Sequence, residues 1–244
     1  MKISIKDTDV NYIQYGKGKE DILLLHGWGQ NIEMMKPIGD RLEEKYRITI
    51  LDFPGFGESE EPKEAWSIDD YVEVVKELVK KQKIKNPIIM GHSFGGRVAI
   101  KYASSNELSK LILFGAPCIR TKEVLTMKVK VLKKLKTLPG MNNIGEKMKK
   151  YIGSRDYKAA SPIMRQTLVN TVNEDLSSSA KKIKVPALLV WGVDDTEAPI
   201  EDAKKLEMIM EDAALITLPG THYAYLENLY QVVNIITAFL EGGN

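Results

Sequence analysis

The chain has 244 residues, a formal net charge of +2 and 43% hydrophobic residues, which suits one large α/β domain with room for an insertion. No window reaches about 18 apolar residues and the N-terminus lacks the features of a signal peptide, so we expect no membrane-spanning helix and no secretion. The single cysteine, Cys118, excludes an internal disulfide and favours a reducing, cytoplasmic setting.

The first half of the chain predicts alternating strands and helices. Residues 1–16 alternate polar and apolar positions, as an edge hairpin does. Short apolar runs that end in glycine or a turn then predict strands buried on both faces, as in a mainly parallel sheet, at 21–27, 46–53, 86–91 and 108–116. Between them, Ser67 and Asp70 form an N-cap pair for a helix whose apolar face comprises Ile68, Val72, Val75 and Val79.

The same rhythm returns after residue 184, with strands at 185–192 and 213–220, a helix at 199–210 and a last helix that ends near Leu240. Residues 118–184 break it, because they predict helices joined by turns and no strand. We therefore expect an α/β core formed by residues 1–117 and 185–244, with a mostly parallel central sheet flanked by helices, and a helical cap insertion at 118–184.

The stretch IIMGHSFGGRVAI, residues 88–100, places a serine between a predicted strand and a predicted helix. A Gly-x-Ser-x-Gly turn at this place lifts the serine hydroxyl clear of the sheet in a strained backbone conformation. Gly91 and Gly95 stand where larger side chains would clash. A glycine-rich turn with an idle serine is the alternative, and the strand–helix context argues against it, so we predict that Ser93 is a nucleophile.

A serine nucleophile needs a histidine base, and the chain has three histidines. His92 adjoins Ser93 on a sharp turn, so its side chain should point away from the hydroxyl, and His26 ends the first core strand. His222 follows the last predicted strand, at the sheet edge where Ser93 lies. We predict that His222 is the base. The few histidines and the single cysteine offer no structural zinc site, and we expect no metal and no cofactor.

The loop after the strand at 185–192 supplies the acid that orients the base, and it offers Asp194, Asp195 and Glu197. Spacing alone does not choose among them, since an aspartate here can also cap the following helix. An oxyanion needs two backbone N–H donors. We predict the amide of Phe94, at the start of a helix, and the amide of Trp28, between two glycines in the loop after the first core strand.

These motifs, in this order, resemble the α/β-hydrolase superfamily over nearly the whole chain: HGWG (26–29), DFPGFGES (52–59), GHSFGG (91–96), WGVDD (191–195) and the late His222. The resemblance implies the α/β-hydrolase fold and a catalytic triad. The W-G-x-x-D motif of the superfamily maps onto Trp191, Gly192 and Asp195, which favours Asp195 over Asp194 as the acid.

The resemblance implies a serine hydrolase that cleaves a small-molecule carboxylic ester through an acyl-enzyme. Carbon–carbon bond hydrolases of the same fold also carry a serine, so the motif leaves them open, as it does the esterases that act on pimeloyl-carrier-protein methyl esters. A hypothesis from another class is a non-catalytic ligand receptor on this fold. Cys118 is a weak rival nucleophile, because nothing around it resembles an activating turn.

One segment carries most of the positive charge. From Arg120 to Lys184 the chain has 16 basic and 5 acidic residues, a net charge of +11, whereas the remainder has 19 basic and 28 acidic residues. A solvated lysine-rich face explains this, and so does a surface that attracts an acidic acyl carrier protein or an anionic lipid surface. Nucleic acid is not expected as a partner, since the segment lacks interleaved aromatic residues for stacking.

Overall fold

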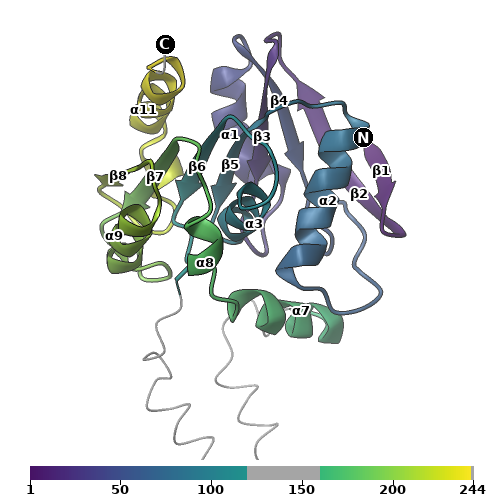
Figure 1. Cartoon of the computed structure of the whole chain (residues 1–244). Helices are drawn as coiled ribbons and strands as arrows, with labels where there is room; N and C mark the ends of the chain where they lie inside the picture. Colours follow the sequence, from purple (N-terminus) through teal and green to yellow (C-terminus); the bar gives the residue numbers. More distant parts are fainter. Residues whose placement is uncertain (120–159, 243–244) are drawn as a thin grey trace, which may run out of the picture.

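An eight-stranded sheet runs through the centre of the computed structural model, which describes residues 1–119 and 160–242 (Figure 1). The strands are β1 (Lys2–Ile5), β2 (Thr8–Tyr15), β3 (Glu20–Leu25), β4 (Tyr46–Leu51), β5 (Ile88–His92), β6 (Lys110–Phe114), β7 (Ala187–Gly192) and β8 (Ala213–Leu218). Their order is β1-β2-β4-β3-β5-β6-β7-β8. The β1–β2 and β2–β4 pairs are antiparallel and the others parallel, which confirms the edge hairpin and the mostly parallel sheet.

Apolar residues on both faces of the central strands explain why their sequences read as continuous hydrophobic runs. In β3, Ile22 and Leu24 pack into the core on one face of the sheet, whereas Leu23 and Leu25 pack into the core on the other. All four side chains are fully buried. Full burial of one such side chain stabilises a fold by about 1.5–3 kcal/mol, so these runs specify both the strands and a layer of helices on each side.

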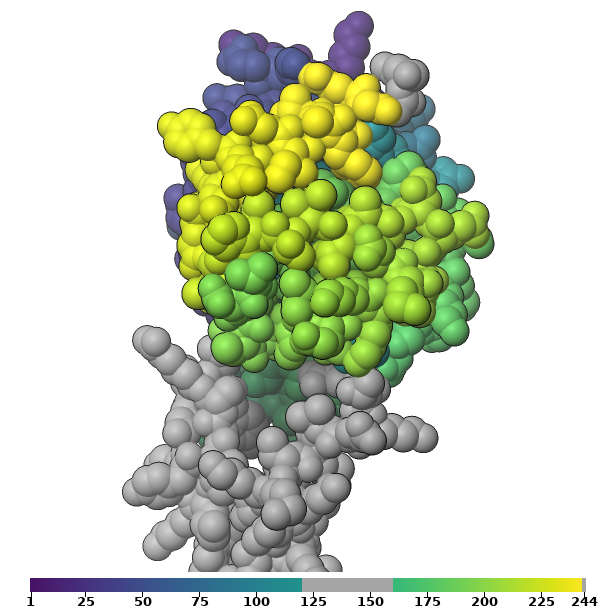
Figure 2. All heavy atoms as spheres, turned by 90° about the vertical axis from the view of Figure 1, so that its left-hand side faces the viewer, coloured from purple at the N-terminus to yellow at the C-terminus, as the bar shows by residue number. Residues whose placement is uncertain are grey.

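Helices cover both faces of the sheet. The helices α1 (Ile32–Leu42), α10 (Ala224–Glu227) and α11 (Leu229–Glu241) pack on one face, and α2 (Ile68–Lys81), α3 (Phe94–Ala103), α8 (Ser177–Ala180) and α9 (Ile200–Ile209) pack on the other. At the β8 edge of the molecule, α9 and α11 form a continuous surface, drawn in lime and yellow (Figure 2). The result is the predicted three-layer α/β arrangement.

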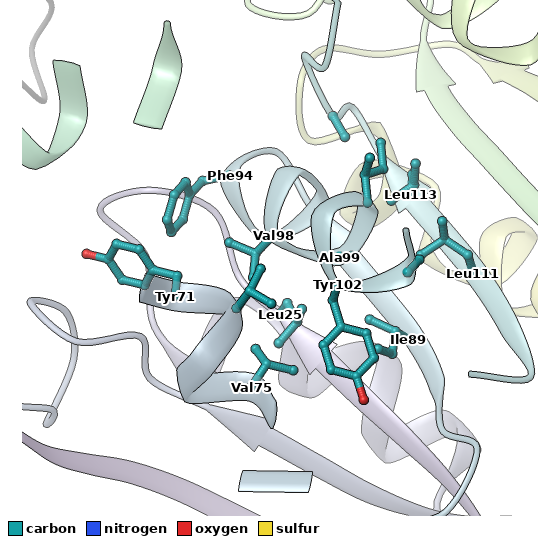
Figure 3. Close-up of a cluster of buried hydrophobic side chains, with 14 of the residues drawn as sticks. Leu25, Tyr71, Val75, Ile89, Phe94, Val98, Ala99, Tyr102, Leu111 and Leu113 are labelled. Atoms are coloured by element: carbon teal, nitrogen blue, oxygen red, sulfur yellow. The ribbon is translucent and has the colours of Figure 1, made fainter. Parts of the chain in front are cut away.

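The helix that follows Ser93 is held firmly against the sheet and against α2. Its side chains at Phe94, Val98, Ala99 and Tyr102 point toward Leu25, Ile89, Leu111 and Leu113 of the strands and toward Tyr71 and Val75 of α2 (Figure 3). Every one of these residues is buried. Because α3 is fixed on two sides, its first turn has a defined position relative to the ends of the parallel strands.

The start of α2 follows the predicted capping pattern. The backbone N–H of Ser67 donates to Asp70 Oδ2 over 2.8 Å, and the Ser67 hydroxyl donates to the same oxygen over 2.7 Å. Ile68, Val72 and Val75 of the predicted apolar face are buried. The cap thus fixes the first turn of a helix that the burial of one face then stabilises.

The predicted cap insertion falls largely on residues 120–159, which lie outside the described residues. Of the rest, α7 (Pro162–Val172) lies across one end of the domain near the start of α2, where Thr167 Oγ1 accepts from the Trp66 N–H over 3.0 Å (Figure 1). Leu176, Ala180 and Ile183 are buried in the same core as α3. The division of the chain into core and cap stays a prediction. Among the described helices, none is both long and apolar enough to cross a membrane.

Candidate active site

Ser93 occupies a sharp corner between β5 and α3. Its φ is 50° and its ψ is −112°, a backbone conformation that costs a residue other than glycine roughly 1–3 kcal/mol. The Ser93 N–H donates to the carbonyl oxygen of Phe114 at the end of β6 over 2.9 Å, and the Ser93 carbonyl accepts from Arg97 N within α3 over 3.1 Å. These bonds and the packing of α3 hold the strained corner in place.

The glycines around Ser93 are required by close backbone contacts. A Cβ at Gly91 would lie 2.6 Å from the Gly95 carbonyl oxygen, and a Cβ at Gly95 would lie 2.3 Å from the Leu25 carbonyl oxygen. Both distances are far shorter than van der Waals contact. The spacing of the two glycines in the sequence therefore reflects a turn in which three backbone segments meet: the ends of β3 and β5 and the first turn of α3.

His222 and Asp195 form a buried pair at the same edge of the sheet. His222 follows β8 and Asp195 follows β7, and their Nδ1 and Oδ2 atoms are 2.8 Å apart. The other oxygen of Asp195, Oδ1, accepts from the N–H groups of Glu197 (2.9 Å) and Ala198 (2.8 Å). The Asp195 side chain has no exposed surface, whereas Asp194 is exposed, so the structure pairs His222 with the aspartate that the W-G-x-x-D motif favours.

Two glycines make room for this pair, and the sequence analysis missed the role of both. Gly115, just after β6, has a φ of 50°, and a Cβ there would lie 3.0 Å from Asp195 Oδ2 and 3.1 Å from His222 Nδ1. A Cβ at Gly192 would lie 2.2 Å from the carbonyl oxygen of Thr221, next to His222. The available signal was a glycine at or just after the end of a parallel strand, at β6 beside the strand that bears the serine and at β7 next to it.

The Ser93 hydroxyl and the His222 ring are not joined by a hydrogen bond within the part of the chain that the structure describes. The carboxylate of Glu197 lies on the Nε2 side of His222, with its Oε2 3.7 Å from that nitrogen. Catalytic hydrogen bonds are often long in enzymes without substrate and shorten when it binds. The structure thus places the serine and the Asp195–His222 pair at one sheet edge without a formed Ser–His bond.

Trp28 and Phe94, the predicted oxyanion donors, lie side by side. Their rings meet edge to face with centroids 5.4 Å apart, and the Trp28 ring packs in the same way on Phe56 at 4.8 Å. Gln30 shapes the loop, because its Oε1 accepts from Gly27 N over 2.9 Å. Among the described residues, neither the Trp28 amide nor the Phe94 amide donates a hydrogen bond, so both are available to an acceptor.

His92 lies between the loop that carries Gln30 and the loop that carries His222. Its Nε2 lies 3.0 Å from the carbonyl oxygen of His222, and its Nδ1 lies 3.1 Å from Gln30 Oε1. Burial, followed by the nearby His222, lowers the pKa of His92 to about 3, so the ring is neutral. A neutral ring carries one proton, so it can donate to only one of these two oxygens. In the tautomer with the proton on Nε2, it donates to the His222 carbonyl and holds the loop that carries the candidate base, and Nδ1 then contacts Gln30 Oε1 without a hydrogen bond.

His26 is a structural residue beneath the loop that carries Trp28. Its Nε2 accepts from the Phe53 N–H over 2.9 Å, so its proton sits on Nδ1, which donates to the Gly27 carbonyl oxygen over 2.7 Å. Burial lowers the pKa of His26 to about 4. Both of its polar atoms are used, which agrees with a role in shaping the loop and leaves neither for proton transfer with a substrate.

Asp52 ties the loop that carries Trp28 to the loop after β4. Its carboxylate is buried and accepts three hydrogen bonds, from Ile32 N (2.8 Å), the Asn11 side chain (2.8 Å) and Glu58 N (2.9 Å). Ile32 begins α1, directly after the Trp28 loop, and a carboxylate at a helix N-terminus is favoured. The motif DFPGFGES therefore acts here through the aspartate that starts it, which supports the loop that carries Trp28.

This geometry has a definite chemical capability. A histidine whose Nδ1–H is held by a buried carboxylate presents Nε2 as a proton acceptor, and a serine at a helix N-terminus beside two available N–H groups can attack a carbonyl and stabilise the oxyanion that forms. Among the described residues, no cluster of three or more His, Cys, Asp or Glu residues could hold a metal ion. Cys118 is buried.

Comparisons with known proteins agree on the fold. Residues 22–136 match a family model described as alpha/beta hydrolase fold. The chain is 27% identical over 252 residues to the AB hydrolase superfamily protein YisY of Bacillus subtilis, covering 89% of this chain and 90% of YisY. The solved structure of the esterase EaEST from Exiguobacterium antarcticum superposes with a TM-score of 0.77 at 23% identity, over 96% of each chain.

Two further relatives differ in what their names say they act on. The chain is 24% identical over 258 residues to a pimeloyl-[acyl-carrier protein] methyl ester esterase of Aliivibrio fischeri, covering 96% of this chain and 98% of the esterase. It is 26% identical over 235 residues to a 2-hydroxy-6-oxononadienedioate/2-hydroxy-6-oxononatrienedioate hydrolase of Paraburkholderia phymatum, covering 81% of this chain and 78% of the hydrolase. The two relatives share the fold and differ in the substrates named.

Proposed function

The chain belongs to the α/β-hydrolase superfamily, and from that premise we propose that it is a serine hydrolase that cleaves a carboxylic ester through an acyl-enzyme. Ser93 is the nucleophile, His222 the base, Asp195 the acid that orients it, and the amides of Trp28 and Phe94 bind the oxyanion. The observation that carries the proposal is the buried Asp195–His222 pair at the sheet edge where a serine stands in a strained turn.

The first half of the reaction forms the acyl-enzyme. Ser93 Oγ attacks the ester carbonyl carbon while His222 Nε2 takes its proton, and the carbonyl oxygen becomes an oxyanion held by the Trp28 and Phe94 N–H groups. Asp195 keeps the proton of His222 on Nδ1 and stabilises the imidazolium. When the tetrahedral intermediate collapses, the bond to the alcohol oxygen breaks and that oxygen takes the proton from Nε2.

The second half returns the enzyme to its starting state. Water attacks the acyl carbonyl as His222 Nε2 takes a proton from it, and the bond to Ser93 Oγ breaks as the proton passes back to the serine. The acid product then leaves. Removal of one oxyanion donor in enzymes of this kind costs about 3 kcal/mol of transition-state stabilisation, so the loop that carries Trp28 contributes to the rate as well as the triad does.

The test is a series of p-nitrophenyl esters from acetyl to dodecanoyl, with Ser93→Ala alongside. We expect hydrolysis that depends on Ser93 and peaks at one chain length, which sizes the acyl pocket. Ser93→Ala should lower turnover by several orders of magnitude while circular dichroism and the unfolding midpoint stay near the wild-type values. Turnover in Ser93→Ala near that of the wild type would refute the proposed mechanism.

Hydrolysis of a carbon–carbon bond is the second candidate. The Paraburkholderia phymatum relative is named as a hydrolase of compounds that contain a ketone and two carboxylates and no ester. In such a compound, the bond that water cleaves is a carbon–carbon bond next to the ketone carbon. The name of this relative therefore indicates that the same fold serves carbon–carbon bond hydrolysis. A chain that cleaves a vinylogous 2-hydroxy-6-oxo dienoate and no ester, still through Ser93, would support this candidate over the esterase.

An acyl-carrier-protein ester is the third possibility for the substrate, and the name of the Aliivibrio fischeri relative favours it. The basic segment from Arg120 to Lys184 would then attract the acidic carrier, although most of that segment lies outside the described residues. Electrostatic steering makes kcat/KM fall as salt rises. A kcat/KM for carrier-bound esters that is the same at low and physiological salt would remove this role.

A non-catalytic ligand receptor on this fold, which never turns over a substrate, would instead leave Ser93 unlabelled by a fluorophosphonate.

A further inference from the structure

Glu197 stands at the one atom of the candidate base that Asp195 leaves free. It lies two residues after Asp195, in the loop between β7 and α9, and its Oε2 is 3.7 Å from His222 Nε2. Its side chain is 63% exposed, whereas the Asp195 side chain has no exposed surface. One carboxylate thus faces each ring nitrogen of His222, the first buried and the second at the opening to solvent.

The backbone fixes where the Glu197 side chain begins. Its own N–H and that of Ala198 both donate to Asp195 Oδ1, and the carbonyl oxygen of Ala198 accepts from Trp191 Nε1 over 2.7 Å. Trp191 and Ala198 are fully buried. The loop is therefore anchored at three points, and replacing the Glu197 side chain removes none of these bonds.

Glu197 supplies the negative charge on the Nε2 side of His222. Asp195 faces Nδ1, the ring of His92 lies 4.7 Å away between centroids and is neutral, and the ring of Tyr223 lies 5.7 Å away. Among the described residues, the carboxylate of Glu197 is the charged side chain that lies within ion-pair distance of His222 Nε2. A charge here acts on whatever approaches that nitrogen.

The reaction brings the alcohol part of the substrate to this place. The departing alcohol oxygen takes its proton from His222 Nε2, so it must lie within about 3.2 Å of that atom. Since Glu197 Oε2 is 3.7 Å from the same atom, the carboxylate and the alcohol oxygen are at most about 7 Å apart. A charge on the alcohol part that lies within about 8 Å of the carboxylate is inside the Debye length at physiological ionic strength, so salt screens its interaction with Glu197 only in part.

We propose that Glu197 is a specificity-determining residue that selects for neutral or cationic alcohol parts and against anionic ones. The inference rests on the proposed function, because it needs His222 Nε2 to protonate the leaving group. The acyl part of the substrate is held on the other side of the scissile bond, so the preference concerns the alcohol part alone.

The test uses three chromogenic esters with one acyl group and different charges on the nitrophenol: p-nitrophenyl, 4-acyloxy-3-nitrobenzenesulfonate, and 4-acyloxy-3-nitrobenzyl trimethylammonium. For Glu197→Gln we expect kcat/KM for the anionic ester, relative to the neutral one, to rise about three- to fivefold, the size of a partly screened surface charge effect. The ratio of the cationic to the neutral ester should fall by a similar factor. Glu197→Lys should reverse the wild-type order of preference.

Asp194→Asn is the matched control. Asp194 is an exposed carboxylate on the same loop, and it is not within ion-pair distance of His222 in the described structure. It removes the same charge, and we expect it to leave the three ratios unchanged. In 0.5 M NaCl the difference between wild type and Glu197→Gln should shrink, because the Debye length falls to a few ångströms.

The outcomes separate this inference from the proposed function. If wild-type protein hydrolyses the neutral ester through Ser93 and Glu197→Gln leaves the ratios unchanged, the role of Glu197 is refuted while the serine hydrolase stands. Equal shifts in Asp194→Asn would also refute it, because a general surface field would then explain the preference. If Ser93 is not labelled and no ester is cleaved, the proposed function fails first.

Discussion

Gly115→Ala should damage catalysis more than it damages the fold. The added Cβ would lie 3.0 Å from Asp195 Oδ2 and 3.1 Å from His222 Nδ1, the two atoms joined by the central hydrogen bond of the pair. Ordinary contacts of a carbon begin near 3.5 Å, so the pair must shift by about 0.5 Å. A misplacement of about 1 Å can cost 100-fold in rate, and we therefore expect kcat to fall by about 10-fold or more.

The effect on stability should be modest and separable. The φ of 50° at Gly115 costs an alanine about 1–2 kcal/mol, which a domain of ordinary stability tolerates. The assay is kcat on the best p-nitrophenyl ester together with urea unfolding. Asn86→Ala is the control, since Asn86 has a φ of 46° at an exposed position outside the candidate site, and it should keep full activity at a similar cost. A Gly115→Ala variant with kcat within twofold of wild type would refute this account of the pair.

Two further predictions concern the acid Asp195 and the buried His26. Asp195→Asn keeps an oxygen for the Glu197 and Ala198 amides but presents an NH₂ group to His222 Nδ1, which forces the ring proton onto Nε2. We therefore expect kcat to fall about 10³- to 10⁴-fold with an unchanged unfolding midpoint. A loss of kcat under 10-fold would contradict the triad. Burial lowers the pKa of His26 to about 4, below the value near 6.5 of an unfolded histidine, so the unfolded chain takes up the proton first and stability, complete above about pH 6.5, declines as the pH falls toward 4. His26→Asn should weaken this dependence in urea unfolding at pH 5 and pH 7, and an equally strong dependence in the variant would contradict the assignment.

The parallel strands and the serine turn were predictable because local sequence determines them. A strand buried on both faces needs an apolar residue at every position, and runs such as Ile22 to Leu25 meet this requirement. The turn at Ser93 needs glycines two residues before and after it, since backbone atoms occupy the space of their side chains. In both cases the residues that give the signal lie within a few positions of the feature, although the backbone that requires Gly95 belongs to the end of β3.

The arrangement around His222 was less predictable, because it depends on contacts between distant segments. Asp194 and Asp195 are adjacent and chemically identical, and only the folded loop exposes one and buries the other against His222. Gly115 shows its purpose only when β6, β7 and β8 bring it to the same pair. The proximity of Glu197 to Nε2 is of the same kind, since no spacing in the sequence specifies a side chain's distance from a ring on another loop.

The most direct test of the central claim is covalent labelling of the folded protein with a fluorophosphonate, followed by intact mass and peptide mapping. An activated serine attacks phosphorus through the same base and oxyanion donors that an ester needs. We predict one adduct per chain, located on Ser93, absent in Ser93→Ala and formed far more slowly in Asp195→Asn. Folded wild-type protein that remains unlabelled, or an adduct that persists in Ser93→Ala, would contradict the account.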